Sequence, residues 1–147
     1  MRAIKPPLRV TEQGITLLEI MVVVVIIGLL VAAVAPQFMN QIDTAEINRA
    51  KQDIRSIETS LNLYRLDNFR YPSTSEGLQA LVTNPGENAA PNWSRPYLRA
   101  VPLDPWQQPY HYASPGQRGG DFDVFTYGAD RQEGGEGVNA DIGNWDL

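Results

Sequence analysis

The feature that most limits the fold of this chain is an apolar run of 21 residues, 15–35, in which Glu19 is the only charged side chain. As an α-helix rising about 1.5 Å per residue, such a run spans roughly 30 Å, which is the thickness of one hydrocarbon core. The basic side chains that flank it, Arg2, Lys5 and Arg9, lie on the N-terminal side only. This asymmetry predicts an N-terminus in the cytoplasm and the rest of the chain outside the cytoplasmic membrane.

Two ordinary interpretations of the run remain open from these residues. The first is a cleaved secretory signal, because Ala33-Val34-Ala35 resembles an A-x-A cleavage site, and the second is a plain N-terminal anchor. Neither explains Glu19, because an ionised carboxylate at this depth costs at least ~2.5 kcal/mol and should face a partner. Pro36 is also an unfavourable residue after a scissile bond. These two residues favour a segment that stays in the mature protein.

Beyond the run, apolar residues recur every three or four positions, which is the spacing of one face of a helix. They are Ile47, Ala50, Ile54, Ile57, Leu61 and Tyr64. We predict one long helix over roughly residues 15–66, apolar in its first half and amphipathic in its second, with a kink or weak point at Pro36. The amphipathic stripe is interpreted as core packing, not as a cofactor-binding face.

The rest of the chain predicts short elements. Ser73 and Glu76 have the spacing of a capping box for a short helix that carries Leu78 and Leu81. Residues 122–127 alternate in part and predict a strand. A small antiparallel sheet packed on the amphipathic half of the helix would bury both surfaces, so the predicted fold class is α+β.

Composition excludes several functions. The chain has no cysteine and a single histidine, His111, so neither a disulfide nor a multi-histidine metal site is available. Residues 15–147 carry a net charge of −7, which disfavours nucleic-acid binding. Asp121 and Asp123 are spaced like paired catalytic acids. At alternate strand positions, however, both are expected to point into solvent, with no nucleophile or base nearby, so we do not expect an enzyme.

The sequence GITLLEIM at residues 14–21 resembles the class III signal of type IV pilins and pseudopilins. The resemblance implies that a prepilin peptidase cleaves between Gly14 and Ile15 and methylates the new N-terminus. The domains are then a cytoplasmic leader (1–14), a transmembrane and polymerisation helix (15–35) and a periplasmic domain (36–147). Glu19 lies one helical turn from the new amine. It is expected to be an assembly residue that pairs with the amine of a neighbouring copy.

Further motifs from residue 51 to the C-terminus resemble the major pseudopilins of bacterial type II secretion systems. The clearest are LYRLDN at 63–68, EGLQALV at 76–82, PLDPW at 102–106, YGAD at 127–130 and DIGNW at 141–145. Gln107-Gln108 replaces the usual Gly-Asn of that family. The resemblance implies a pilin-like fold and a structural subunit in the bacterial inner membrane. The subunit would polymerise to drive export of folded proteins across the outer membrane.

The partners implied by this family are further copies of the chain, minor pseudopilins, the prepilin peptidase and an inner-membrane assembly platform. The alternative is a subunit of a type IV pilus for adhesion or motility. Such pilins commonly close a C-terminal loop with two cysteines, which this chain lacks.

The last 28 residues hold seven carboxylates and one arginine, with several glycines. From the residues alone this is either a solvated acidic loop or a calcium loop, because a glycine-rich segment is costly to order without a bound cation. The family resemblance implies a structural calcium here. The ligands it implies are Asp130 first, then the carbonyls of Tyr127 and Val138, with Asn139 and Asp141 as further candidates. Where this chain has Asn139 many relatives have Asp, so ligation through Glu136 is an alternative.

Overall fold

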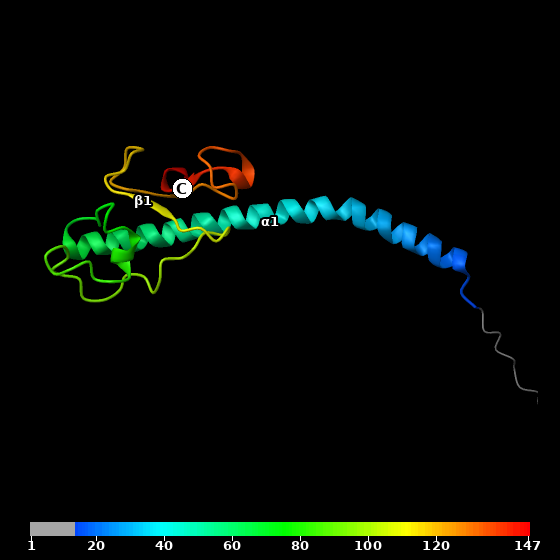
Figure 1. Ribbon diagram of the computed structural model, residues 1–147, viewed down its shortest axis with the longest axis horizontal. Helices are drawn as coiled ribbons and strands as arrows, with labels where there is room; N and C mark the ends of the chain where they lie inside the picture. Colours follow the sequence, from blue (N-terminus) through cyan, green and yellow to red (C-terminus); the bar gives the residue numbers. More distant parts are fainter. Residues whose placement is uncertain (1–13) are drawn as a thin grey trace, which may run out of the picture. The chain divides into compact units, whose positions relative to one another are not determined.

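The structure is a computed structural model that describes residues 14–147, with only the backbone described for residues 35–40. The predicted leader therefore lies, but for Gly14, outside the described residues. The longest element is helix α1 (Leu17–Asn68), 52 residues long (Figure 1). The chain forms two compact units that divide between Met39 and Asn40, and α1 contributes to both. The predicted long helix is confirmed to within two residues at each end.

Local chemistry sets both ends of α1. The hydroxyl of Thr16 accepts the backbone N–H of Glu19 at 3.2 Å, so Thr16 acts as the N-cap and the helix begins at Leu17, not at Ile15. At the other end the backbone of Phe69 turns to a φ of +59°, which no helix can continue. The N–H of Phe69 still reaches the carbonyl of Arg65, at 2.7 Å, and closes the last turn.

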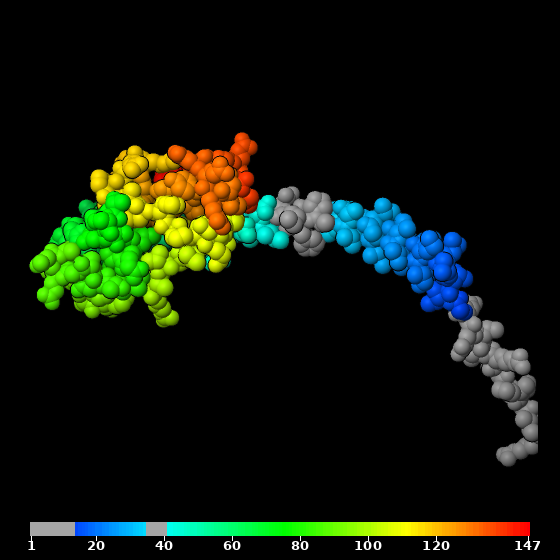
Figure 2. Space-filling view, viewed as in Figure 1, coloured from blue at the N-terminus to red at the C-terminus, as the bar shows by residue number. Residues whose placement is uncertain are grey.

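The core of the second unit forms on the predicted stripe of α1. Ile54, Ile57, Leu61 and Tyr64 are all fully buried, and Leu78, Leu81 and Val124 pack with them from later segments. Loops of the middle of the chain and the small sheet flank this half of the helix (Figure 1). In the space-filling view these segments, distant in sequence, pack directly against one another (Figure 2). The amphipathic half of α1 is thus a core helix, as predicted.

The two hydrogen bonds of the predicted capping box form, but they close a turn at residues 73–77 and do not cap the helix, whose N-cap is Gly77 without a side-chain hydrogen bond. The Ser73 N–H donates to the Glu76 carboxylate at 2.7 Å, and the Glu76 N–H donates back to the Ser73 hydroxyl at 3.3 Å. The helix that follows is a single 3₁₀ turn, Leu78–Leu81, whose Leu78 and Leu81 side chains enter the core.

The sheet has three short antiparallel strands in the order β1 (His111–Ala113), β2 (Asp123–Thr126) and β3 (Ile142–Gly143). Its register pairs Tyr112 with Val124 and Thr126 with Ile142, so these four side chains share the inner face. The strand predicted at residues 122–127 is confirmed as β2. The α+β class, with a long helix and a small antiparallel sheet, is confirmed as well.

One expectation about this sheet is wrong. Asp121 is exposed and forms an ion pair with Arg65, but Asp123 is 4% exposed. The loop that connects β1 to β2 folds over Asp123, whose carboxylate accepts the backbone N–H groups of Gln117 and Arg118 at 2.6 and 3.1 Å. Asp123 therefore closes a loop and does not point into solvent.

Candidate functional site

The first candidate site is the start of α1. Ile15 precedes the helix and is 71% exposed, and Glu19 lies in the first turn. Among the described residues, the Glu19 carboxylate has neither an ion pair nor a hydrogen bond, whereas its backbone N–H is capped by Thr16.

The helix that follows has no apolar partner in its own chain among the described residues. Residues Leu17–Val34 have a mean hydropathy of 3.1, none of this window is buried, and its length is sufficient to cross a membrane. A helix that is apolar all round is stable only in lipid or among other helices. Glu19 is the one charged side chain in this window.

The second candidate site is the C-terminal loop, which is closed at its base by backbone contacts. Gly128 directly follows Tyr127, and the N–H of Ala129 donates to the carbonyl of Val138 at 2.9 Å. Gly128 has a φ of +71°, and a Cβ at this position would lie 2.5 Å from the Val138 oxygen. The structure thus brings the backbone of Tyr127 close to that of Val138, two of the predicted ligands, although they are eleven residues apart.

The predicted side-chain ligands differ in their surroundings. Asp130 is exposed, and its Oδ1 accepts the Gln132 N–H at 3.1 Å, while Oδ2 has neither a hydrogen bond nor an ion pair among the described residues. Asp141 is engaged within the loop: its Oδ1 accepts the Gly134 N–H at 3.0 Å and its Oδ2 lies 3.8 Å from Arg118. Asn139 lies in a 3₁₀ turn, Gly137–Asn139, that begins directly after Glu136.

These donors suit a hard cation. All of the predicted ligand atoms are oxygens, supplied by carboxylates, one amide and backbone carbonyls, as calcium prefers. Carbonyl oxygens of both Val138 and Ala140 lie within 3 Å of where a Cβ of Gly128 would be, so they converge on this point. In residues 14–147 no three His, Asp or Glu side chains cluster in a way that would hold a metal by side chains alone. A site here must rely on the backbone.

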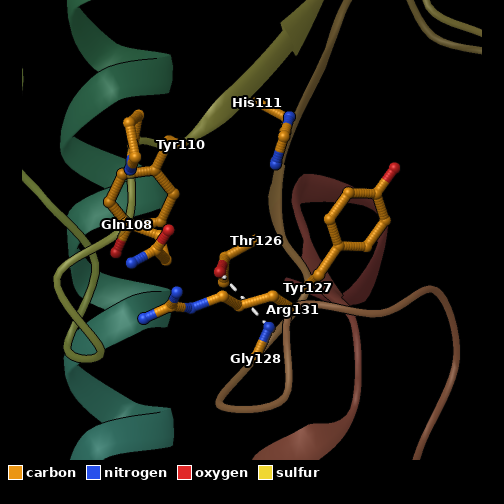
Figure 3. Close-up of a pocket in the computed structure, with 8 residues that line it drawn as sticks. Gln108, Tyr110, His111, Thr126, Tyr127, Gly128 and Arg131 are labelled. Carbon is orange, nitrogen blue, oxygen red and sulfur yellow. Dashed lines mark hydrogen bonds between the residues drawn. The ribbon is translucent and has the colours of Figure 1, made fainter.

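A hollow of about 320 Å³ lies beside the base of this loop, between β1 and the end of β2. Gln108, His111 and Tyr127 are among its lining residues, and the Arg131 side chain extends across it toward Gln108 (Figure 3). His111 stacks on Phe125, with the ring centroids 5.1 Å apart.

Sequence reasoning missed two residues near this hollow. Asp104 is fully buried, and its carboxylate accepts the hydroxyl of Thr126 and, at 2.7 Å, the backbone N–H of Gln108. The signal in the sequence was an aspartate inside a proline-flanked turn, because such residues cap backbone groups of their own turn. The contact to Thr126 has no sequence signal.

A charged clamp fixes the segment that leaves α1. The Arg70 guanidinium makes two parallel contacts of 2.7 Å with the Glu76 carboxylate, and it also donates to the carbonyl of Ala89. This bidentate pair, helped by the two hydrogen bonds from Ser73, lowers the pKa of Glu76 to about 2 from 4.5.

The clamp predicts acid sensitivity. Because the pKa of Glu76 is lowered on folding, its contribution is complete above pH 4.5 and is lost as the pH falls toward about 2. We expect Glu76→Gln to lower the unfolding free energy at pH 7 by about 2 kcal/mol, and the difference from wild type to shrink across that range. Urea denaturation at several pH values measures this. Glu87→Gln, which changes an exposed glutamate, is the control. An equal loss at pH 7 and pH 2 would contradict the assignment.

Comparison with known proteins identifies the family. A family model described as "Type II secretion system (T2SS), protein G" matches residues 37–145, and one described as "Prokaryotic N-terminal methylation motif" matches residues 9–35. A "Type II secretion system core protein G" from Pseudomonas aeruginosa is 53% identical over 137 residues, covering 92% of this chain and 96% of the relative. The protein of the same description from Vibrio cholerae is 48% identical, covering 92% and 93%.

A solved structure agrees. The crystal structure of the major pseudopilin from the type 2 secretion system of enterohaemorrhagic Escherichia coli superimposes with a TM-score of 0.64 at 39% identity, covering 74% of this chain and 94% of that one. The expectation of a structural subunit and not an enzyme is confirmed by this family. The chain belongs to the type II secretion system protein G family, the major pseudopilins.

Proposed function

We propose that this chain is the repeating subunit of a type II secretion pseudopilus, polymerising through the first half of α1 to drive folded proteins across the outer membrane. The observation that carries the proposal is the wholly exposed apolar helix Leu17–Val34 with one carboxylate, Glu19, in its first turn that is unpaired among the described residues. Family membership favours this function over a type IV pilus subunit for adhesion or motility.

The chain is inserted once in the inner membrane before assembly, with its N-terminus in the cytoplasm and residues 36–147 in the periplasm. The basic residues of the leader and the match to an N-terminal methylation motif at 9–35 support this orientation and processing. A prepilin peptidase removes residues 1–14 and methylates Ile15. Minor pseudopilins and an inner-membrane assembly platform are the other partners.

Assembly neutralises two charges that would be costly in an apolar bundle. Cleavage after Gly14 leaves an amine on Ile15, four residues before Glu19. In a stack of parallel helices the amine of one copy meets the Glu19 carboxylate of its neighbour. Because that carboxylate is capped by no group of its own chain among the described residues, pairing with a neighbour breaks no existing contact.

The test is Glu19→Ala in a secreting cell. We expect normal membrane insertion, since the segment becomes more apolar, but loss of most polymer and of secretion. Sheared polymer and secreted protein are the two readouts, and intact mass of the membrane fraction checks that the mature chain starts at Ile15.

Asp43→Ala, which removes a partly exposed carboxylate from the same helix outside the apolar window, is the control and should assemble and secrete as wild type does. Wild-type polymer from Glu19→Ala would refute the pairing, and a mature chain starting at Pro36 would refute the processing.

We also propose that a structural calcium ion orders the C-terminal loop. The ligands are Asp130 and the carbonyls of Tyr127 and Val138, with Asn139 and Asp141 or Glu136 completing the set. The contact between Ala129 and Val138 and the Oδ2 of Asp130, free among the described residues, support this choice. When bound, the ion supplies a cross-link between the two ends of a segment that buries little apolar surface.

The calcium prediction is a shift in thermal stability. Calcium at a hundred times its Kd stabilises the folded chain by about 2.7 kcal/mol, and EGTA removes this gain. We expect Asp130→Asn to remove most of it, because the first carboxylate anchors the ion. Thermal unfolding of the purified chain in detergent, with calcium and then EGTA, measures both. Glu133→Gln, which removes the same charge from an exposed position of the same loop, is the control. If chelation leaves the wild-type unfolding temperature unchanged, the loop is an ordinary acidic loop.

A further inference from the structure

Asp104 is a buried carboxylate with no cationic partner among the described residues. It is 0% exposed and lies in the turn between Leu103 and Pro109, which form an isolated bridge. One oxygen accepts the Gln108 N–H and the other accepts the Thr126 hydroxyl. Burying a charge without a counter-ion is costly, so a carboxylate at this position is expected to have a role that an apolar residue could not fill.

That role is visible at Thr126, which is 1% exposed at the end of β2. A hydroxyl has one proton, and here it goes to Asp104. The hydroxyl oxygen is therefore left to accept, and it accepts the backbone N–H of Gly128 at 3.3 Å (Figure 3). Asp104 thus sets the direction of the hydroxyl, and the hydroxyl holds the Gly128 N–H.

The Gly128 N–H belongs to the same planar peptide group as the Tyr127 carbonyl. Because the peptide bond is rigid, holding the N–H also fixes the direction of that carbonyl oxygen. The next backbone hydrogen bond along the chain, from the Ala129 N–H to the Val138 carbonyl, begins one residue later. The hydrogen bonds that run from Asp104 through Thr126 therefore end on the peptide group whose carbonyl, that of Tyr127, is one of the proposed calcium ligands.

We infer that Asp104, acting through Thr126, is a positioning residue for the C-terminal calcium loop: it orients the Tyr127–Gly128 peptide so that the Tyr127 carbonyl is preorganised for the cation. This inference rests on the calcium site proposed above. Groups that orient metal ligands typically change metal affinity 10–100-fold when they are removed, so we expect a loss of about tenfold or more here.

The experiment is calcium titration by calorimetry on the full-length chain in detergent, after removal of bound metal with EGTA. Thr126→Val keeps the shape of the side chain and removes the hydroxyl, and we expect its Kd to rise about tenfold or more. Thr126→Ser keeps the hydroxyl, and its Kd should stay close to that of wild type. Asp104→Asn is the second variant and should weaken binding in the same direction as Thr126→Val.

Asp123→Asn controls for the loss of a buried carboxylate as such. Asp123 is 4% exposed and caps the β1–β2 loop, so its replacement should lower the unfolding temperature of the metal-free chain and leave the calcium Kd unchanged. Wild-type affinity in folded Thr126→Val and Asp104→Asn, with reduced stability only, would overturn the inference and leave the calcium proposal intact. A wild-type chain that binds no calcium would overturn both.

Discussion

Replacing Gly128 by alanine is expected to lower the unfolding free energy of the chain by more than about 2 kcal/mol. An L-residue at the φ of +71° seen here costs roughly 1–2 kcal/mol. The added methyl group would also lie 2.5 Å from the Val138 oxygen and 2.9 Å from the Ala140 oxygen, which are backbone atoms and cannot turn aside. Relief of this clash would break the hydrogen bond from Ala129 to Val138 and open the base of the loop.

Urea denaturation of the purified chain, followed by tryptophan fluorescence, measures the effect. Gly119→Ala is the matched control, because Gly119 has a φ of +96° but nothing within 4 Å of the added methyl group. It therefore reports the backbone strain alone. If both substitutions lowered the unfolding free energy by the same amount, the base of the loop would accommodate the added methyl group without a steric penalty. Calcium binding by Gly128→Ala should be weakened as well, since the Tyr127 carbonyl shares a peptide group with residue 128.

The long helix could be predicted because two simple patterns describe it. Both the apolar run and the stripe, with its spacing of three and four residues, indicate a helix and no other element. In the structure the stripe residues Ile54, Ile57, Leu61 and Tyr64 are completely buried, as the stripe predicts. The error of two residues at the start arises from Thr16, whose side chain caps the helix. The helix continues past the predicted end because the Phe69 N–H still reaches the Arg65 carbonyl, at 2.7 Å.

The sheet could be predicted only in part. β2 has four residues, but β1 has three and β3 has two, and runs this short show no periodicity. The burial of Asp123 could not be predicted, because it depends on how the β1–β2 loop folds back. The left-handed backbone of Gln107, with a φ of +66°, is a conformation that favours glycine, so a glutamine at this position gives no sequence signal for it.

The residues of the candidate sites also differ in whether the sequence alone can identify them. Glu19 can be identified from the sequence because a charge in an apolar run is unusual by itself. The proximity of Tyr127 to Val138 depends on loop closure, so the ligand set comes from a family resemblance and stays a prediction. Asp104 has a sequence signal as a turn residue, but its contact with Thr126, 22 residues away, has none, because only the fold creates that contact.

Leu61→Ala is expected to destabilise the chain by about 3 kcal/mol, because removing a buried leucine loses its transfer free energy and leaves a cavity. Leu61 is fully buried between Ile57 and Tyr64 on the core stripe. The unfolding free energy of a domain of this size is roughly 5–15 kcal/mol, so this substitution would remove a large share of it. Urea denaturation again measures it.

Leu66→Ala in the same helix is the control, since Leu66 is 71% exposed and helix propensities of leucine and alanine are close. We expect a change within about 0.5 kcal/mol, as for most surface substitutions. The contrast tests whether this half of α1 is held by its buried face alone. If Leu66→Ala were as damaging as Leu61→Ala in the purified, unassembled chain, the exposed face would carry stability too. The stripe would then not be what holds the helix to the sheet.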